Sequence, residues 1–185
     1  MQIIKDKALL LKLRNPKRVT ETIPKSRVTG PHEVAVNWGI DEVHTLRSLG
    51  VKAPSPISKR YSWPGRFKPM GHQQTTAEFL TLHKKAFCFN EQGTGKTASA
   101  IWAADFLMEQ GKVRRALVIC PLSIMDSAWR ADLFDVAMHR TVDVAHGSAD
   151  KRKKIVNAGA DFVVINYDGV EIVEDEIKNG AFDLI

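Results

Sequence analysis

A phosphate-loop pattern between an apolar run and a helical segment constrains this sequence more than any other feature. Residues 86–107 have the sequence AFCFNEQGTGKTASAIWAADFL, in which Gly93-Thr94-Gly95-Lys96-Thr97 joins the two segments. Glycines allow the backbone to curl so that several N–H groups converge on one anion. The N-terminus of the following helix adds a partial positive charge. The pattern therefore predicts a site for the phosphates of a nucleoside triphosphate.

The residue types in this loop indicate which groups would bind ATP and Mg²⁺. The lysine of such a loop reaches the β- and γ-phosphates, and the hydroxyl that follows it ligates magnesium. We therefore expect Lys96 and Thr97 to be catalytic, with Thr97 also binding Mg²⁺. Asn90 stands where the general pattern has its first glycine. The other loop residues expected to contact ATP are Glu91, Gln92, Gly93, Thr94, Gly95 and Ala98.

Apolar runs alternate with helical patterns from residue 72 onward. Strands are expected at 86–89, 115–120, 142–145 and 161–166, and helices at 74–83, 97–110, 124–134, 149–157 and 168–178. This alternation is typical of an α/β fold whose parallel sheet is covered on both faces. Right-handed crossovers would make the sheet doubly wound. Ligands bind outside the carboxyl ends of such strands, which is where the phosphate loop is expected.

The chain before residue 72 has a different composition and predicts two further segments. Residues 1–52 are expected to form a small basic α+β extension. Residues 53–71 are expected to be a proline-rich linker with basic and aromatic side chains and no element of its own. The ATP-binding domain would then comprise residues 72–185. Within the extension, strands are expected at 2–13 and 33–38, and a helix at 40–49.

Charge is distributed unevenly between these parts. The net charge is +6, but residues 1–70 contain 14 Lys and Arg against 5 Asp and Glu, whereas residues 71–185 contain 13 against 16. A basic appendage on a nearly neutral domain indicates binding to a polyanion, either DNA or RNA. A solvated basic face that keeps the chain soluble is the alternative.

The sequence also bears on membrane association, secretion and the state of its cysteines. No apolar run approaches the ~18 residues of a membrane span. The N-terminus lacks the succession of charged, apolar and small residues that is typical of a signal peptide. We therefore expect a location in the cytoplasm or on the nucleoid, and no membrane partner. Cys88 and Cys120 each lie in an apolar run, which predicts two core thiols rather than a disulfide or a metal site.

The loop has the sequence NEQGTGKT, and the segment KPMGHQQTTAEFL precedes it. These two segments resemble motif I and the segment ahead of it in superfamily 2 helicases, especially the Swi/Snf-like branch of DNA-dependent ATPases. ALVICPLSIMDSAW is similar to motif Ia, AHGSADKR to the His-Gly element of the family, and FVVINYDGV to motif Ib. FDLI resembles the strand that enters motif II. The resemblance covers about residues 68–185 and does not extend to the first 50 residues.

The resemblance implies a partial P-loop lobe of the RecA-like type that couples ATP hydrolysis to movement on DNA, duplex rather than single-stranded. It implies that Gln73 recognises adenine, with Gln74 as the alternative. It also implies that motifs Ia and Ib contact nucleic acid through Pro121, Ser123, Asn166 and Tyr167. A second RecA-like lobe, absent from these residues, would close over the γ-phosphate of ATP.

Several of these side chains have simpler interpretations. Trp129 would be a core residue of a helix, His146 a turn residue, and Ser123 a helix N-cap. The aromatic and basic side chains of the linker suit stacking on bases, but packing of the linker on the lobe is an equal alternative. These side chains are Tyr61, Trp63 and Phe67, among Lys59, Arg60, Arg66 and Lys68.

The sequence ends at Ile185, within the strand that resembles the approach to motif II. In the family, the Asp-Glu pair of that motif holds Mg²⁺ and activates water. We therefore expect an N-terminal fragment that does not hydrolyse ATP by itself. Two other functions stay open at this point. One is the motor subunit of a restriction–modification system, and the other is a nucleotide- and DNA-binding fragment that never hydrolyses ATP.

Overall fold

The computed structural model describes residues 1–185, and the chain divides into two compact units. Unit 1 comprises residues 1–62 and 78–86, and unit 2 comprises residues 63–77 and 87–185. Helix α4 (Gly71–Thr81) contributes residues to both. No helix is long and apolar enough to cross a membrane.

Unit 1 is an antiparallel sheet with short helices, an α+β arrangement. The strands have the order β1-β2-β4-β3. Alternation places Leu9, Leu11, Val34 and Val36 on one face, where they are buried. They share a core with residues of α2 and of α1. The elements are β1 (Gln2–Ile4), β2 (Ala8–Lys12), α1 (Lys17–Thr22), β3 (Arg27–Gly30), β4 (Glu33–Asn37), α2 (Ile40–Ser48) and α3 (Ile57–Arg60).

Three of these elements were not predicted. Helix α1 buries only Val19, and α3 is a four-residue turn of helix inside the expected linker. Strand β3 pairs with β4 through a register shift between Val28 and Gly30. Each element is too short to carry a hydrophobic period, so the sequence pattern could not reveal it. The expectation that residues 53–71 contain no element was therefore wrong at α3.

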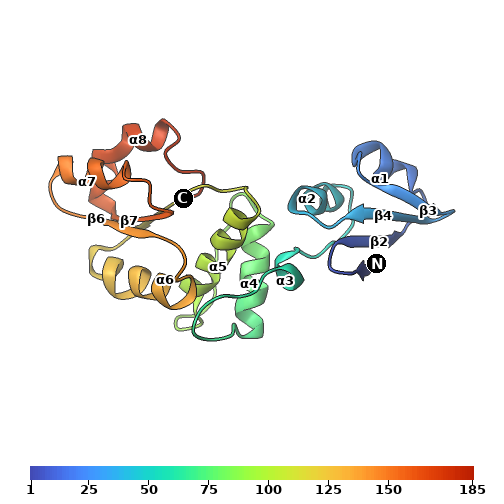
Figure 1. The fold of residues 1–185 in the computed structure, drawn as a ribbon, viewed down its shortest axis with the longest axis horizontal. Coiled ribbons are helices and arrows are strands. Elements are labelled where there is room, and N and C mark those ends of the chain that lie inside the picture. Colours follow the sequence, from blue (N-terminus) through green and yellow to red (C-terminus); the bar gives the residue numbers. More distant parts are fainter. The chain divides into compact units, whose positions relative to one another are not determined.

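Unit 2 contains the parallel sheet that the alternation of apolar runs predicts. Its strands are β5 (Ala116–Cys120), β6 (Val142–Ala145) and β7 (Phe162–Asn166), in the order β5-β7-β6. Every residue of the central strand β7 is buried. Helices α7 (Ala149–Val156) and α8 (Glu174–Lys178) lie on one face of the sheet, and α6 (Ala131–Val136) lies on the other (Figure 1). The partial RecA-like α/β fold is confirmed.

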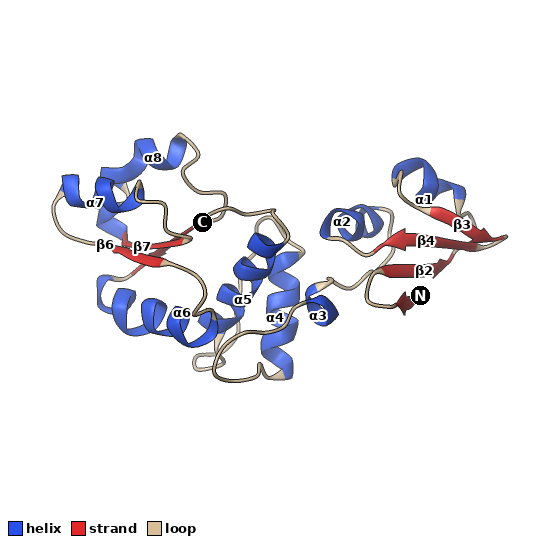
Figure 2. Cartoon of the chain, viewed as in Figure 1, coloured by secondary structure: helices blue, strands red, loops and turns tan.

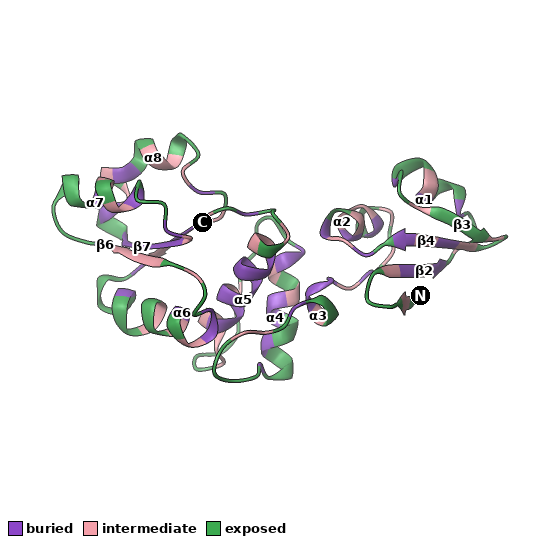
Figure 3. Cartoon of the chain, in the orientation of Figure 1, coloured by how far each residue is buried: buried purple, intermediate pink, exposed green.

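Two apolar clusters cover the two faces of this sheet. Val163 and Ile165 belong to a cluster with residues of α7 and the segment around α8. Val164 points the other way and packs with Cys120 and Met125. Figure 3 shows this burial in the sheet and the exposed outer faces of α7 and α8.

The strand predicted at 86–89 does not form. The segment between α4 and α5 (Lys96–Glu109) contains no strand (Figure 2), and Phe87 and Phe89 are 82% and 89% exposed, with their rings stacked 5.7 Å apart. A strand needs a neighbour for its N–H and C=O groups. One edge of β5 pairs with β7, and at the other edge Ala116 forms a parallel bridge with Leu184. Cys88 is consequently half-buried rather than in a core strand, although Cys120 is buried and both thiols are free.

Two predicted helices are broken into shorter turns. The helix predicted at 124–134 is a 3-10 turn (Leu122–Ile124), a π-helical turn (Met125–Arg130) and then α6. The helix predicted at 168–178 is replaced by the 3-10 turns Tyr167–Gly169 and Glu171–Val173 and by α8. Trp129 is half-buried against the cluster around Met125, as the core interpretation expects.

Candidate nucleotide-binding site

The phosphate loop leads directly into α5, the longest helix of the structure. Gly93 and Gly95 have φ angles of 79° and 75°, and Gly95 is the residue that caps the helix N-terminus. Positive φ angles are accessible to glycine without strain. A Cβ atom at position 93 would meet nothing within 4 Å, so the loop is open on that side.

The ammonium group of Lys96 is held by its own loop. Nζ donates hydrogen bonds to the carbonyl oxygens of Asn90 at 2.9 Å and Glu91 at 2.8 Å. The hydroxyl of Thr94 also donates to the Glu91 carbonyl, at 2.8 Å. The three bonds close the loop around a cation. Phosphate oxygens would compete for the same ammonium group, and they carry the stronger charge.

The remaining loop residues expected at the ATP site differ in exposure. Glu91, Gln92 and Gly93 are exposed, and Thr94, Gly95 and Thr97 are half-buried. Ala98 is 5% exposed. Thr97 offers a hydroxyl oxygen in the first turn of α5, and Mg²⁺ prefers oxygen ligands supplemented by phosphate and water. The donor set therefore fits Mg²⁺ bound together with a triphosphate.

Gln73 lies against the phosphate loop, and Gln74 does not. The side chain of Gln73 is buried, its Nε2 donates to the Thr94 carbonyl at 3.3 Å, and its Oε1 accepts from the backbone N–H of Met70 at 2.9 Å. Gln74 is exposed and donates to the carbonyl of Pro69 at 3.4 Å. Of the two candidates for adenine recognition, only Gln73 has contact with the loop.

Two further residues of α4 bind this loop, and the sequence did not indicate them. His72 Nε2 lies 3.1 Å from the Thr94 carbonyl oxygen. Thr76 Oγ1 accepts a hydrogen bond from Asn90 Nδ2 at 2.8 Å. His72 and Thr76 are separated by one helical turn, so a single face of α4 follows the loop. Their spacing of one helical turn is the sequence signal that could have indicated these two contacts.

Helix α5 carries a buried carboxylate that holds the segment ahead of β6. Asp105 is completely buried, and its Oδ1 accepts from Arg140 Nε at 2.6 Å and lies 3.0 Å from His139 Nε2. Arg140 also approaches Asp161 at 3.7 Å. Burial, followed by the charge of Asp105, raises the pKa of Glu109 above its ordinary value. A buried carboxylate with two cationic or polar partners fixes the orientation of α5.

Within unit 2, linker residues 63–67 pack on α5 and α6. Trp102 Nε1 donates to the carbonyl of Pro64 at 3.0 Å, and the rings of Trp63 and Phe67 meet Trp102 edge to face at 5.7 and 6.0 Å. Arg66 pairs with Asp135 at 3.0 Å. These contacts support the packing interpretation of Trp63 and Phe67 rather than base stacking.

The predicted nucleic-acid contacts gather at the carboxyl edge of the parallel sheet. Pro121 and Ser123 follow β5, Asn166 ends β7, and Tyr167 comes next; parallel pairing brings these ends together. Pro121 and Ser123 are exposed, Ser123 caps no helix, and Tyr167 is 62% exposed.

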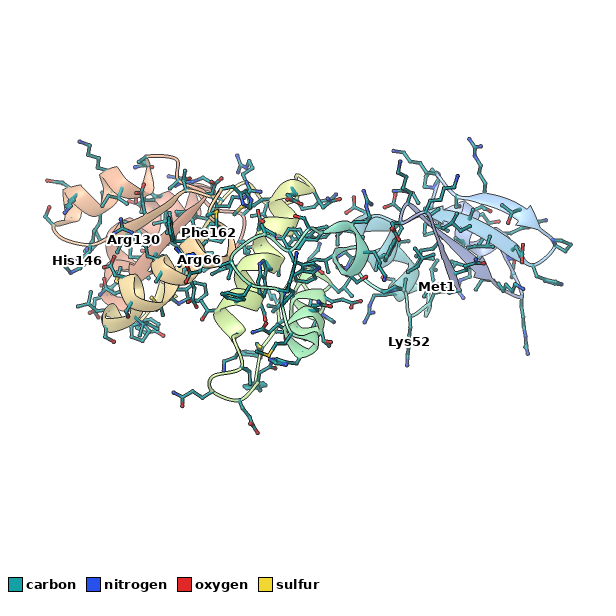
Figure 4. The ribbon with its side chains drawn as sticks, turned by 60° about the horizontal axis from the view of Figure 1, so that its bottom comes forward. Met1, Lys52, Arg66, Arg130, His146 and Phe162 are labelled. Carbon is teal, nitrogen blue, oxygen red and sulfur yellow. The ribbon has the colours of Figure 1, made fainter.

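Asn166 and His146 occupy opposite environments at this edge. Asn166 is 6% exposed, and its Oδ1 accepts from Arg152 at 2.6 Å while its Nδ2 donates to Asp168 at 3.3 Å. A direct contact of this side chain with nucleic acid stays a prediction. His146 follows β6, is exposed, and lies at the margin of unit 2 (Figure 4).

Comparison with known proteins gives one family and one fold. The SNF2-related domain family matches residues 72–185. The structure of the Sulfolobus solfataricus SWI2/SNF2 ATPase core in complex with dsDNA is similar, with 24% identity and a TM-score of 0.50. The similar region covers 57% of this chain and 23% of that chain, so this chain spans only about a quarter of its relative's length. The likeness to that structure concerns the fold. No curated protein matches the sequence.

Proposed function

Because this chain belongs to the SNF2-related domain family, we propose that it is the ATP-binding first lobe of a DNA-dependent ATPase that couples hydrolysis to movement on DNA. The observation that carries the proposal is the phosphate loop at the start of α5, with Gln73 bonded to the Thr94 carbonyl. The loop supplies groups for the phosphates, and the neighbouring glutamine amide supplies a donor and an acceptor for adenine.

Each residue of the site has a proposed role. Lys96 would exchange its two carbonyl partners for β- and γ-phosphate oxygens, and the amides of Gly93 to Ala98 would point at the same phosphates. Thr97 would hold Mg²⁺, which neutralises phosphate charge during transfer. Gln73 would choose adenine over guanine through its amide.

Duplex DNA is the proposed partner of the carboxyl edge of the sheet. Pro121, Ser123 and Tyr167 lie there on exposed backbone turns, where hydrogen bonds to the sugar-phosphate backbone position a protein without selecting a sequence. The similar Sulfolobus structure was solved with dsDNA, which supports a duplex rather than a single strand. A second RecA-like lobe would complete the ATP site, and the cytoplasm or nucleoid is the location that suits this function.

We propose that these 185 residues bind ATP without hydrolysing it. None of the strands β5, β6 and β7 runs directly into an Asp-Glu pair, and the pair that comes later, Asp175-Glu176, lies within α8. Phosphoryl transfer to water needs such carboxylates to hold Mg²⁺ and to orient the attacking water.

Calorimetric titration with ATP and Mg²⁺ tests the site. Lys96→Ala should weaken ATP binding about ten- to a hundredfold, because charge-assisted hydrogen bonds contribute roughly 1.5–3 kcal/mol. Lys154→Ala, at an exposed position of α7, is the matched control and should bind ATP like the parent. Equal ATP affinity for Lys96→Ala and the parent would refute the site. DNA-stimulated hydrolysis of ATP by the chain alone would refute the proposal that these residues bind ATP without hydrolysing it.

A further inference from the structure

A buried arginine joins the two loops at the carboxyl edge of the sheet. Arg152 lies on α7 and is 8% exposed. Its Nε donates to the carbonyl of Gly147 at 2.9 Å, and its Nη1 donates to the carbonyl of Ala145 at 3.0 Å and to Asn166 Oδ1 at 2.6 Å. One guanidinium group therefore fixes the end of β6 and the end of β7 relative to each other.

The guanidinium group also packs closely under the turn that follows β7. A Cβ atom at Gly169 would overlap Arg152 Nη1 and lie 2.8 Å from Ile165 Cγ1. Gly169 closes the 3-10 turn that begins at Tyr167. The position of Tyr167, which is exposed, thus depends on the buried arginine beneath its turn.

The charge of Arg152 has no carboxylate partner. It makes no ion pair in the structure, and its acceptors are two backbone carbonyls and one amide oxygen. Asp168 is connected to it only through the amide of Asn166. Buried charges in proteins are ordinarily paired, because desolvation penalises a lone ion. A positive charge therefore remains to be neutralised at this edge.

We propose that Arg152 is a positioning residue for DNA binding, and that a phosphate of the DNA backbone supplies its missing counter-charge. The inference rests on the proposed function. The side chains of Arg152 and Asn166 hold the His146–Gly147 loop and the Tyr167 turn in one arrangement, and the exposed groups of these loops contact the DNA. Asn166 then acts by orienting Arg152 and presenting Tyr167, not by touching a base.

The position of Arg152 within α7 separates this role from a general basic surface. Lys151, Lys153 and Lys154 surround Arg152 in sequence but are exposed or half-buried. Arg152 shares the buried face of α7 with Val156, one turn later. An exposed lysine contributes screened charge only, whereas the buried arginine has a fixed geometry and three acceptors.

The first test compares Arg152→Gln with Lys154→Gln, which removes the same charge from an exposed position of the same helix. Fluorescence anisotropy with a labelled DNA duplex measures DNA affinity, and calorimetry measures ATP affinity. Arg152→Gln should weaken DNA binding about tenfold or more, while ATP affinity stays within about twofold. Parallel losses of ATP and DNA affinity in Arg152→Gln would show a purely structural role and overturn the inference.

The second test keeps the net charge and moves one carboxylate. Asn166→Asp combined with Asp168→Asn gives Arg152 a direct ionic partner, while an amide and a carboxylate still face each other. This double variant should melt no lower than the parent and bind DNA about fivefold more weakly, because the counter-charge is now supplied internally. Asp168→Asn alone should bind DNA no more weakly than the parent.

The outcomes of the second test separate the two proposals. A double variant that binds DNA as tightly as the parent overturns the role of Arg152 and leaves the proposed function standing. A parent chain that binds ATP but no DNA overturns DNA binding by this lobe, and the role of Arg152 with it. Weaker DNA binding with unchanged melting temperature and ATP affinity is the expected result.

Discussion

The side-chain amide of Gln73 lies directly against Gly95 of the phosphate loop, and a Cβ atom at position 95 would overlap its nitrogen atom. The same nitrogen donates to the carbonyl of Thr94. The glycine therefore has two functions at once: it adopts a φ of 75° at the start of α5, and it leaves room for the glutamine. The proposed adenine-reading group and the phosphate loop are in this way one packed assembly.

Gly95→Ala should reduce the preference for ATP over GTP, because the new methyl group displaces the Gln73 amide. Gly93→Ala is the matched control: it has a φ of 79° but open space around its Cβ. Both variants should lose about 1–2 kcal/mol of folding free energy, the usual cost of a left-handed conformation outside glycine. Competition titrations of ATP against GTP measure the preference.

The control decides the interpretation of this comparison. Only Gly95→Ala should change the choice of base, and Gln73→Ala should change it in the same direction. A change of equal size in Gly93→Ala would mean that loop strain, and not the Gln73 contact, sets the preference. An unchanged preference in Gln73→Ala would return Gln74 or another group to consideration.

The sequence predicts the parts of this fold whose signal is local. The segments predicted as strands at 115–120, 142–145 and 161–166 are mainly apolar, as buried parallel strands require, and strands form at 116–120, 142–145 and 162–166. The glycine and lysine spacing of the loop likewise predicts where α5 begins. Residues 86–89 have the same apolar character, but a strand also depends on a neighbour, which no local pattern specifies.

The roles of the buried polar residues of α5 and α7 could not be predicted from the sequence. Asp105 is one of two acidic residues in the largely apolar sequence of α5, the other being Glu109 at its end, and Arg152 is one of four consecutive basic residues. Their partners, Arg140 and Asn166, are 35 and 14 positions away. Helical spacing places Arg152 on the buried face with Val156, yet charge in such a run ordinarily indicates a solvated surface.

Replacement of the buried Asp105 by Asn should destabilise the chain by about 2–4 kcal/mol, because Arg140 loses a desolvated ionic partner. Glu109→Gln also removes one carboxylate from α5, one turn later. Glu109 is exposed, and its pKa is raised above the ordinary value. That control should change stability by less than about 0.5 kcal/mol. Urea titration at constant pH measures both variants. Equal effects would contradict a special role for the buried carboxylate.

Unit 1 should contribute a salt-dependent, sequence-independent share of DNA affinity. It contains 14 Lys and Arg against 6 Asp and Glu. Lys5→Gln combined with Lys7→Gln removes two exposed charges from the turn between β1 and β2. If both side chains contact phosphates, the slope of log K against log salt should decrease in magnitude by about 1.8.

A matched double variant identifies the source of that slope. Lys112→Gln combined with Lys178→Gln removes the same charge from unit 2, away from the carboxyl edge of its sheet. Its slope should equal that of the parent when both are measured over about 50–200 mM salt. If the Lys5 and Lys7 variant also keeps the parental slope, this turn is merely solvated.

The ion pair of Arg114 with Asp183 should make the stability of unit 2 depend on acid. Asp183 accepts from the Arg114 side chain at 3.0 and 3.1 Å and from its backbone N–H at 2.8 Å, and these bonds lower the pKa of Asp183 from 3.8 to about 2. A carboxylate with a lowered pKa stabilises the fold above its unfolded pKa, and this contribution is lost as pH falls from about 4 through 2. Asp183→Asn should therefore be less stable than the parent near neutral pH, and the difference should shrink over that interval.

Asp6→Asn, at an exposed turn with a φ of 52° that asparagine also tolerates, should show no such trend. Urea titrations from about pH 6 down to about pH 2 measure the differences. A difference for Asp183→Asn that stays constant across this range would show that the ion pair contributes nothing to folding.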